Sequence, residues 1–93
     1  MFDSVLRRMP ELVRTSRYVM TIHGQEEMEA DRLSVFDVEH CILTGGIVER
    51  QRDPRTREWK YLVEGEALSG HRSVVVSKIG PTGVLVVITV YLL

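Results

Sequence analysis

The hydrophobic pattern is clearest at the end of the chain, where two apolar runs rich in β-branched residues flank a short turn. The runs cover residues 73–79 and 84–92, and Gly80-Pro-Thr-Gly83 joins them. Such runs separated by Gly and Pro predict an antiparallel hairpin. The last run is apolar at successive positions, which is typical of a central strand covered on both faces. Thr89 and Tyr91 are its only hydroxyls, and because they are two residues apart they share one face.

The first half of the chain carries helical rather than alternating patterns. Apolar residues recur at helical spacing over Ser4–Val13, although Pro10 lacks a backbone donor and should kink or split that helix. A second helix is predicted over residues 21–32, capped by the threonine at its start. Ser34 opens a third helix, Val35–Leu43, because an acidic side chain at the third helical position completes a capping box.

Strands are predicted in the second half. Alternation of apolar and polar side chains predicts a half-buried strand over Trp59–Glu64, and residues 47–51 would form its partner across a turn. A pure meander would leave the apolar last strand at an edge, so we expect Arg17–Met20 to pair with its free side. Helices followed by strands indicate an α+β protein. The sequence therefore predicts one domain over residues 1–93, with two or three N-terminal helices packed on one face of a four-stranded, mainly antiparallel sheet.

The composition is that of a globular domain: 93 residues, of which 44% are hydrophobic and 27% charged. The one cysteine, Cys41, cannot form a disulfide within the chain and fits a reducing cytoplasm. The three histidines, His23, His40 and His71, are too far apart in the sequence to match a metal-binding motif. The last apolar run is too short and too β-branched for a membrane helix. We expect a cytoplasmic protein without metal, cofactor or membrane partner.

The net charge of −1 gives no overall attraction to nucleic acid, but the charge is unevenly distributed. Residues 1–17 and 48–60 each carry a net charge of +2, whereas residues 18–47 carry −5. Ten of the twelve basic residues are arginine, whose side chain suits two-point contacts with phosphate. The candidate RNA-binding side chains are Arg50, Arg52, Lys60 and Arg72. The alternative is that these cations form solvated faces with local ion pairs.

His23 is the best candidate for catalysis. It falls in the first turn of the predicted second helix, where a neutral imidazole could act as a general base, and Glu27 one turn further on could orient it. Metal-free RNA cleavage needs a base for the ribose 2′-OH, a donor for the leaving oxygen and a cation for the phosphate. Arg32 and either Arg50 or Arg72 as cations, with the hydroxyls of Thr89 and Tyr91, would complete that set. The alternative is a histidine that donates to a carbonyl between helix and sheet.

The order of several short motifs adds a family resemblance. The motifs are Ile22-His-Gly24, Met28, Asp31-Arg-Leu-Ser34, Asp37-Val38, Thr44-Gly-Gly46, Gly65 and Ile88-Thr-Val-Tyr91. Over Tyr18–Tyr91 the chain resembles a bacterial domain-of-unknown-function family that is grouped with the RelE- and MqsR-like ribonuclease toxins of the barnase–EndoU–colicin–RelE fold. The resemblance implies a RelE-like fold with its core in residues 18–92, and Gly24 departs from it because that family usually has alanine there. It points to the candidate catalytic residues His23, Arg32, Thr89 and Tyr91.

The resemblance also implies partners. Many members of that family are encoded beside a small antitoxin, often with a YgiT-type zinc finger. Their substrate would be messenger RNA, which the ribosome could present. We therefore expect the toxin endoribonuclease of a bacterial type II toxin–antitoxin pair.

Two alternatives stay open. A non-catalytic RNA- or protein-binding module of the same fold would use the arginine-rich hairpin Arg50–Lys60, with Trp59 and Tyr61, as its partner surface. A homodimer would use the exposed faces of Val74–Val76 and Leu85–Val87, and the sequence does not say which faces are exposed.

Overall fold

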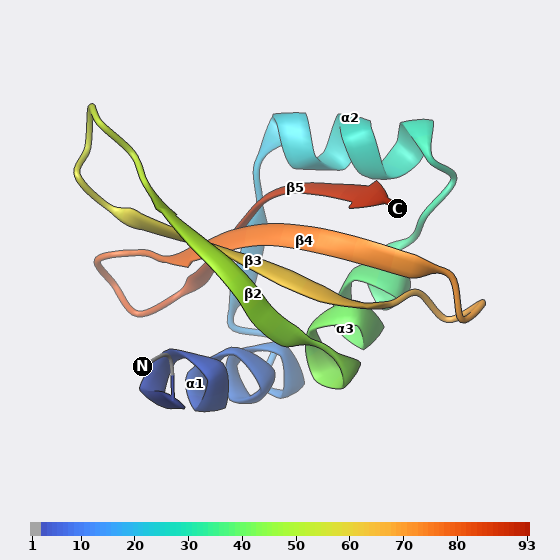
Figure 1. Cartoon of the computed structure of the whole chain (residues 1–93), viewed down its shortest axis with the longest axis horizontal. Coiled ribbons are helices and arrows are strands. Elements are labelled where there is room, and N and C mark those ends of the chain that lie inside the picture. Colours follow the sequence, from blue (N-terminus) through green and yellow to red (C-terminus); the bar gives the residue numbers. More distant parts are fainter. Residues whose placement is uncertain (1–2) are drawn as a thin grey trace.

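Three helices and five strands make up the chain in the computed structural model, which describes residues 3–93 apart from the side chains of Asp3 and Leu6. In chain order the elements are α1 (Asp3–Arg14), β1 (Tyr18–Met20), α2 (Ile22–Ala30), α3 (Val35–Thr44), β2 (Gly46–Arg52), β3 (Trp59–Glu66), β4 (Arg72–Ile79) and β5 (Leu85–Leu92). Figure 1 shows α1 and α3 on one side of the sheet, with α2 alongside β5.

The strands form a single mixed sheet in the order β1-β5-β4-β3-β2. The four later strands pair antiparallel, as the predicted hairpins require, whereas β1 pairs parallel with β5. The predicted α+β class is confirmed, and so is the pairing of the short segment after α1 with the last strand. The predicted number of four strands is wrong. Tyr18–Met20 adds a fifth, because without it the backbone groups of residues 85–87 would stand unpaired at an edge.

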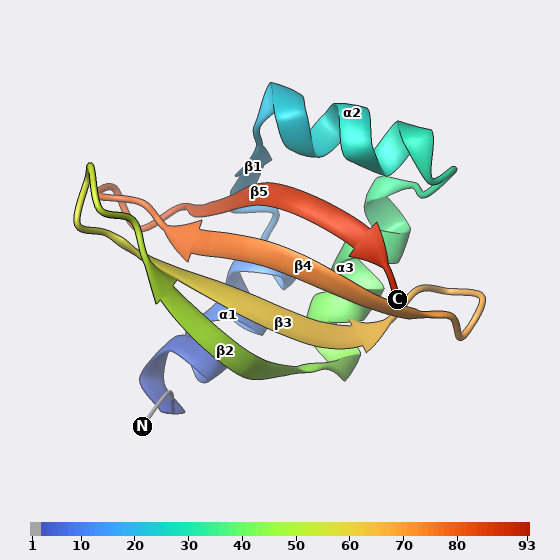
Figure 2. The same cartoon turned by 45° about the horizontal axis from the view of Figure 1, so that its top comes forward.

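One face of the sheet is covered by α1 and α3 and holds the core. Its fully buried side chains include Met9 from α1, Val38 from α3 and Val75 from β4. The predicted alternation in β3 is confirmed, because Val63 is buried on this face and Tyr61 packs against the same core. In the part of the chain that the structure describes, no helix layer covers the opposite, open face (Figure 2). On that face Thr89 is half-buried and Tyr91 is exposed, so the expectation that the last strand is covered on both faces is wrong there.

A β-bulge in β5 decides which of its side chains face the helices. The register between β4 and β5 shifts after Val76, so that Ile88 has no partner on β4. Val87 and Val90 are three residues apart, yet both are buried on the helix-covered face. The bulge therefore reverses the alternation in the second half of β5.

The free edge of β5 is paired first with β1 and then covered by the two ends of α2. The Thr21 hydroxyl donates to the Ile88 carbonyl at 2.9 Å and accepts from the backbone N–H of Gly24 at 3.0 Å, as the predicted N-cap. At the other end of α2, the Asp31 carboxylate accepts from the backbone N–H of Leu92 at 3.3 Å. The helix thereby forms hydrogen bonds with backbone groups of β5 that could otherwise pair with a strand of another chain.

Gly24 and Gly65 are places where a helix and a strand approach closely. A Cβ on Gly24 would lie 3.0 Å from the carbonyl oxygen of Ile88, and a Cβ on Gly65 would overlap the carbonyl oxygen of Cys41. Backbone therefore meets backbone where α2 lies on β5 and where α3 lies on β3. The lack of a side chain at Gly24 and Gly65 permits this close packing.

The helix ends follow the sequence more closely than the helix interiors. α1 runs unbroken through Pro10, so the expected split does not occur. α3 begins, as predicted, at a complete capping box between Ser34 and Asp37. Its buried residues are Val38, Cys41 and Ile42. Val35 is not among them and is 38% exposed.

We expect the capping box of α3 to make stability depend on pH in acid. Hydrogen bonds from the backbone N–H groups of Ser34 and Leu68 hold the pKa of the Asp37 carboxyl below its ordinary value of 3.8. Because the unfolded chain then binds the proton more readily, the stabilisation is complete above the unfolded-state pKa and is lost as pH falls through the folded-state pKa.

Asp37→Asn should therefore lower the free energy of unfolding by about 1 kcal/mol at pH 7 and by less at pH 3, as measured by urea unfolding. Glu29→Gln, which removes an exposed carboxylate from α2, serves as the control. An Asp37→Asn effect of the same size at both pH values would contradict this linkage.

A second prediction concerns the attachment of α2. Thr21→Val keeps the shape of the side chain but removes its hydrogen bonds to Ile88 and Gly24, so the free energy of unfolding should fall by about 1–2 kcal/mol. Thr82→Val, in the exposed turn between β4 and β5, is the matched control and should change it by less than about 0.5 kcal/mol. Equal effects of the two substitutions in urea unfolding would show that Thr21 does not hold the helix.

Candidate functional site

His23 is exposed in the first turn of α2, on the side of the helix that borders the open face of the sheet. Gly24 meets β5 at Ile88, and Met28 is buried in the core on the other side. At about 100° per residue, Met28 lies about 40° from Gly24 in one sense and His23 lies about 100° from it in the opposite sense. Among the described contacts His23 makes no hydrogen bond, so it is not the carbonyl-bonded histidine of the alternative interpretation.

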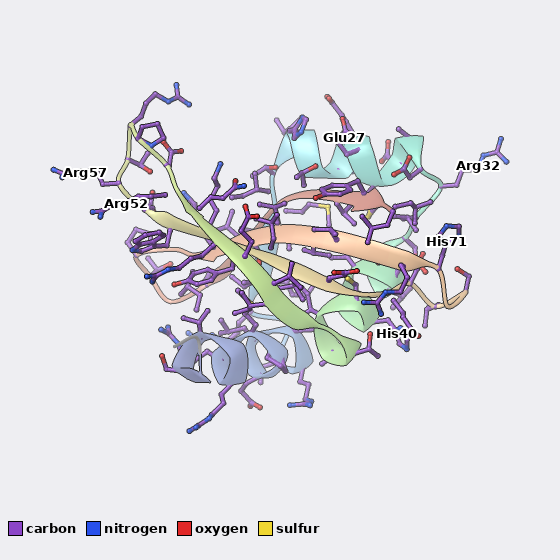
Figure 3. All side chains as sticks on the ribbon, in the orientation of Figure 1. Glu27, Arg32, His40, Arg52, Arg57 and His71 are labelled. Carbon is purple, nitrogen blue, oxygen red and sulfur yellow. The ribbon has the colours of Figure 1, made fainter. Side chains whose placement is uncertain are left out.

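Glu27 lies on the same side of α2 as His23, about 60° from Gly24, and is half-buried. It is one turn from His23, as the sequence indicates, and Figure 3 shows it on the outer side of α2. The two side chains are therefore neighbours on one helix face.

Thr89 and Tyr91 share the open face of β5, as their spacing predicts. Their partners across the antiparallel pair are Val76 and Val74, which lie on the face opposite to the core residue Val75. Thr89 is half-buried and Tyr91 is 37% exposed. We refer to His23, Glu27, Thr89 and Tyr91 as the open-face strip, because all four lie on this side of the α2–β5 pair.

Arg32 lies at the opposite end of α2 from His23. The nine residues of α2 span about 14 Å, and Figure 3 shows Arg32 pointing away from the molecule. Its φ of 57° is left-handed, and its N–H donates to the Glu29 carbonyl at 3.0 Å, while Leu33 donates to Met28 at 2.8 Å. This helix-ending geometry usually uses glycine. In this structure, Arg32 and His23 do not meet.

Arg72 is the arginine beside Tyr91 on the open face. It stands two residues before Val74, the partner of Tyr91, which makes Arg72 and Tyr91 diagonal neighbours across β4 and β5. Its guanidinium lies 3.4 Å from the Glu64 carboxylate and 3.8 Å from that of Glu66. Both pairs are largely exposed, and such pairs contribute little to stability.

Arg50 and Arg52 lie on the other face of the sheet from Arg72. Their partners across the β2–β3 pair are Tyr61 and Trp59, whose side chains face the helices. The guanidinium carbons of Arg50 and Arg52 lie 4.0 and 5.3 Å from the centroid of the Trp59 ring, within cation–π distance. Lys60 alternates with these aromatic residues and projects to the open face. The predicted RNA-binding residues are therefore divided between the two faces.

The arginines of α1 and of the segment after it belong to no sequence motif, and only the net charge of +2 in residues 1–17 marks them. Two adjoining cavities of about 450 and 400 Å³ lie between α1 and the ends of the two hairpins, and they share Arg8 and Gly83. We call them together the α1 groove. Its cationic lining residues are Arg7, Arg8 and Arg17, and its aromatic ones are Trp59 and Tyr61. No residue of the open-face strip lines it.

Two other potentially reactive side chains, Cys41 and His40, lie in surroundings that do not favour catalysis. Burial raises the pKa of the Cys41 thiol, which makes it a poor nucleophile. A ring nitrogen of His40 lies 2.9 Å from the Glu66 carbonyl oxygen. Within residues 3–93, no group of three or more His, Cys, Asp or Glu is placed to hold a metal ion. In the same range, none of the helices has the length and apolar character needed to cross a membrane.

The architecture defines an α+β domain whose mixed sheet carries helices on one face, with the open-face strip on the other. The chain belongs to the family described as Domain of unknown function (DUF4258), whose model matches residues 20–92. Membership of a domain-of-unknown-function family is thus confirmed, and the relation of this family to ribonuclease toxins stays a prediction. No curated protein and no solved structure matches the chain significantly. The matched range includes the whole open-face strip, whereas α1 and Arg17 lie outside it.

The left-handed backbone at Arg32 gives a prediction for stability. Arg32→Gly and Arg32→Ala both remove the guanidinium, but only glycine adopts this φ without strain. The glycine variant should have a free energy of unfolding about 1 kcal/mol above that of the alanine variant, measured by urea unfolding. A lower value for glycine than for alanine would contradict the observed helix end.

Proposed function

We propose that this protein is an endoribonuclease that cleaves RNA without a metal ion, with His23 as the general base. One observation supports it above the others. The Thr21–Ile88 hydrogen bond fixes the start of α2 on β5, and it leaves an exposed imidazole on the same side as the Thr89 and Tyr91 hydroxyls. A base and hydroxyl donors on one exposed side of two packed elements suit the cleavage of a phosphodiester.

The proposed step needs no oxidant or other reactant. Neutral His23 accepts the proton of a ribose 2′-OH, and the 2′-oxygen attacks the adjacent phosphorus. The bond between phosphorus and the 5′-oxygen breaks, and the leaving oxygen takes a proton from a hydroxyl of the strip, for which the exposed phenol of Tyr91 and the hydroxyl of Thr89 are the candidates. The products are a 2′,3′-cyclic phosphate and a 5′-OH, and solvent returns the proton from His23 to the donor.

Arg72 is the cation best placed to stabilise the charge on the phosphate in this step. It neighbours Tyr91 on the open face, whereas Arg32 points away from the opposite end of α2. Its ion pairs with Glu64 and Glu66 are largely exposed. A phosphate could displace these carboxylates from Arg72, because arginine binds phosphate through two parallel hydrogen bonds. Arg32 would then contact a neighbouring phosphate of the same strand.

The proposal includes a RelE-like fold and a role as the toxin of a type II toxin–antitoxin pair. The order of motifs and the α+β architecture with helices on one face of the sheet support it. A cognate antitoxin, for which a zinc-finger protein is the expected type, would be encoded beside it. The net charge of −1 favours messenger RNA presented by the ribosome, since free RNA binding normally draws on many phosphate contacts.

A non-catalytic RNA-binding module is the second candidate. The α1 groove favours it, because its arginines and aromatic side chains lie apart from the open-face strip.

The test is cleavage of RNA by purified protein, alone and with translating ribosomes, in the presence of a chelator. His23→Gln should reduce the rate about 100-fold or more, because a general base contributes about 10²–10⁴-fold. His71→Gln removes another exposed histidine, in the turn between β3 and β4, and should leave the rate unchanged (Figure 3). Undiminished cleavage by a folded His23→Gln protein, or products that lack a cyclic phosphate, would overturn the proposal.

A further inference from the structure

The α1 groove concentrates positive charge in a chain whose net charge is −1. Its lining includes Arg7, Arg8 and Arg17, all exposed, and two carboxylates, Glu11 and Glu58. No carboxylate among the side chains that the structure describes forms an ion pair with any of these three arginines. A ligand of the groove therefore meets guanidinium groups that it does not have to separate from a carboxylate of the described residues.

The two carboxylates of the groove do not neutralise it, because each is paired with a cation that does not line it. Glu58 lies 3.1 Å from the ammonium group of Lys78, and Glu11 lies 3.9 Å from the guanidinium of Arg14. The electrostatic balance of the groove is therefore positive, and an anionic ligand fits it.

The aromatic wall of the groove narrows the choice of ligand. Trp59 and Tyr61 line the larger cavity together with Arg8, and the guanidinium groups of Arg50 and Arg52 lie over the Trp59 ring. Its volume of about 450 Å³ is within the range of small-ligand sites. Rings and arginines side by side bind single-stranded nucleic acid, because the bases stack while the phosphates meet the cations.

We propose that the α1 groove binds single-stranded RNA, with phosphates on Arg7, Arg8 and Arg17 and a base against the aromatic wall. An acidic protein segment would meet the same cations but would gain little from the aromatic wall, so RNA is the better match. The site is separate from the open-face strip. The inference rests on the proposed function in one respect, namely that the RNA held here is the strand that the strip cleaves.

The groove combines residues from inside and outside the range that the family model matches. The family match begins at residue 20, whereas Arg7, Arg8 and Arg17 come before it, on α1 and in the segment that follows. α1 and the hairpin ends form the groove jointly, so neither creates it alone.

The single tryptophan of the chain reports directly on the groove. Its fluorescence is followed while a 2′-O-methyl oligouridylate, which lacks the reactive 2′-OH, is added in phosphate-free buffer at two salt concentrations. The oligonucleotide should quench Trp59, and raising the salt should weaken binding. Absence of quenching at either salt concentration would overturn the proposal.

Two double variants test whether RNA binding depends on the arginines of the groove or only on the total positive charge of the protein. Arg7→Ala/Arg8→Ala should weaken binding about tenfold or more and make it less sensitive to salt. Arg55→Ala/Arg57→Ala removes the same charge from the exposed tip of the β2–β3 hairpin and should change the affinity by less than about twofold (Figure 3). Equal losses in the two variants would overturn the proposal.

Two further ligands test whether the groove binds RNA, a free nucleotide or an acidic protein. Uridine monophosphate should bind far more weakly than the oligonucleotide, and equal affinity would mean a free-nucleotide site instead. Polyglutamate should not displace the RNA, and tighter binding of polyglutamate than of RNA would assign the groove to an acidic protein. His23→Gln should bind the oligonucleotide as the unchanged protein does. A protein that binds RNA in the groove but does not cleave it would contradict only the proposed nuclease activity. A protein that cleaves RNA but does not bind it in the groove would contradict only the proposed groove.

Discussion

The rest of the structure depends on how the outer edge of β5, the edge away from β4, is hydrogen-bonded. β5 is the most apolar strand, and its outer edge is too long for the three residues of β1. The start and the end of α2 complete the edge through Thr21 and Asp31, and the β-bulge at Ile88 is where the start of the helix docks. An unpaired apolar strand would invite association with another chain, so this pairing protects the fold and also fixes the position of α2.

The same constraint separates two surfaces. Because α2 lies along the edge of the sheet, its outer side borders the open face, where β5 presents hydroxyls and β4 presents Arg72. α1 packs against the other face with α3, and the hairpin ends meet α1 there to form the α1 groove. A chain of 93 residues thus presents the proposed catalytic residues on one face and a cationic, aromatic groove on the other. A strand of RNA that reached both would have to pass around the molecule.

Local signals were enough to predict much of this fold and some of the site. The Pro/Gly turn, the capping box at Ser34 and the N-cap at Thr21 involve residues close in sequence, and each forms as expected. The bulge at Ile88 was not predictable, because it depends on the register between distant strands and on the docking of α2. The α1 groove was missed for the same reason. Positive charge in residues 1–17 was visible, but its meeting with Trp59 depends on how α1 packs across the sheet.

The central claim is that His23 and Thr89 face a common substrate on the open side of α2 and β5. Nuclear magnetic resonance of the labelled protein tests it most directly, by following the imidazole signals of His23 and the methyl signal of Thr89 as an uncleavable RNA is added. The two sets of signals should shift together and saturate at the same RNA concentration, whether or not the Trp59 indole also responds. Shifts confined to the Trp59 indole and the α1 arginines, with His23 and Thr89 unchanged at saturation, would contradict the claim.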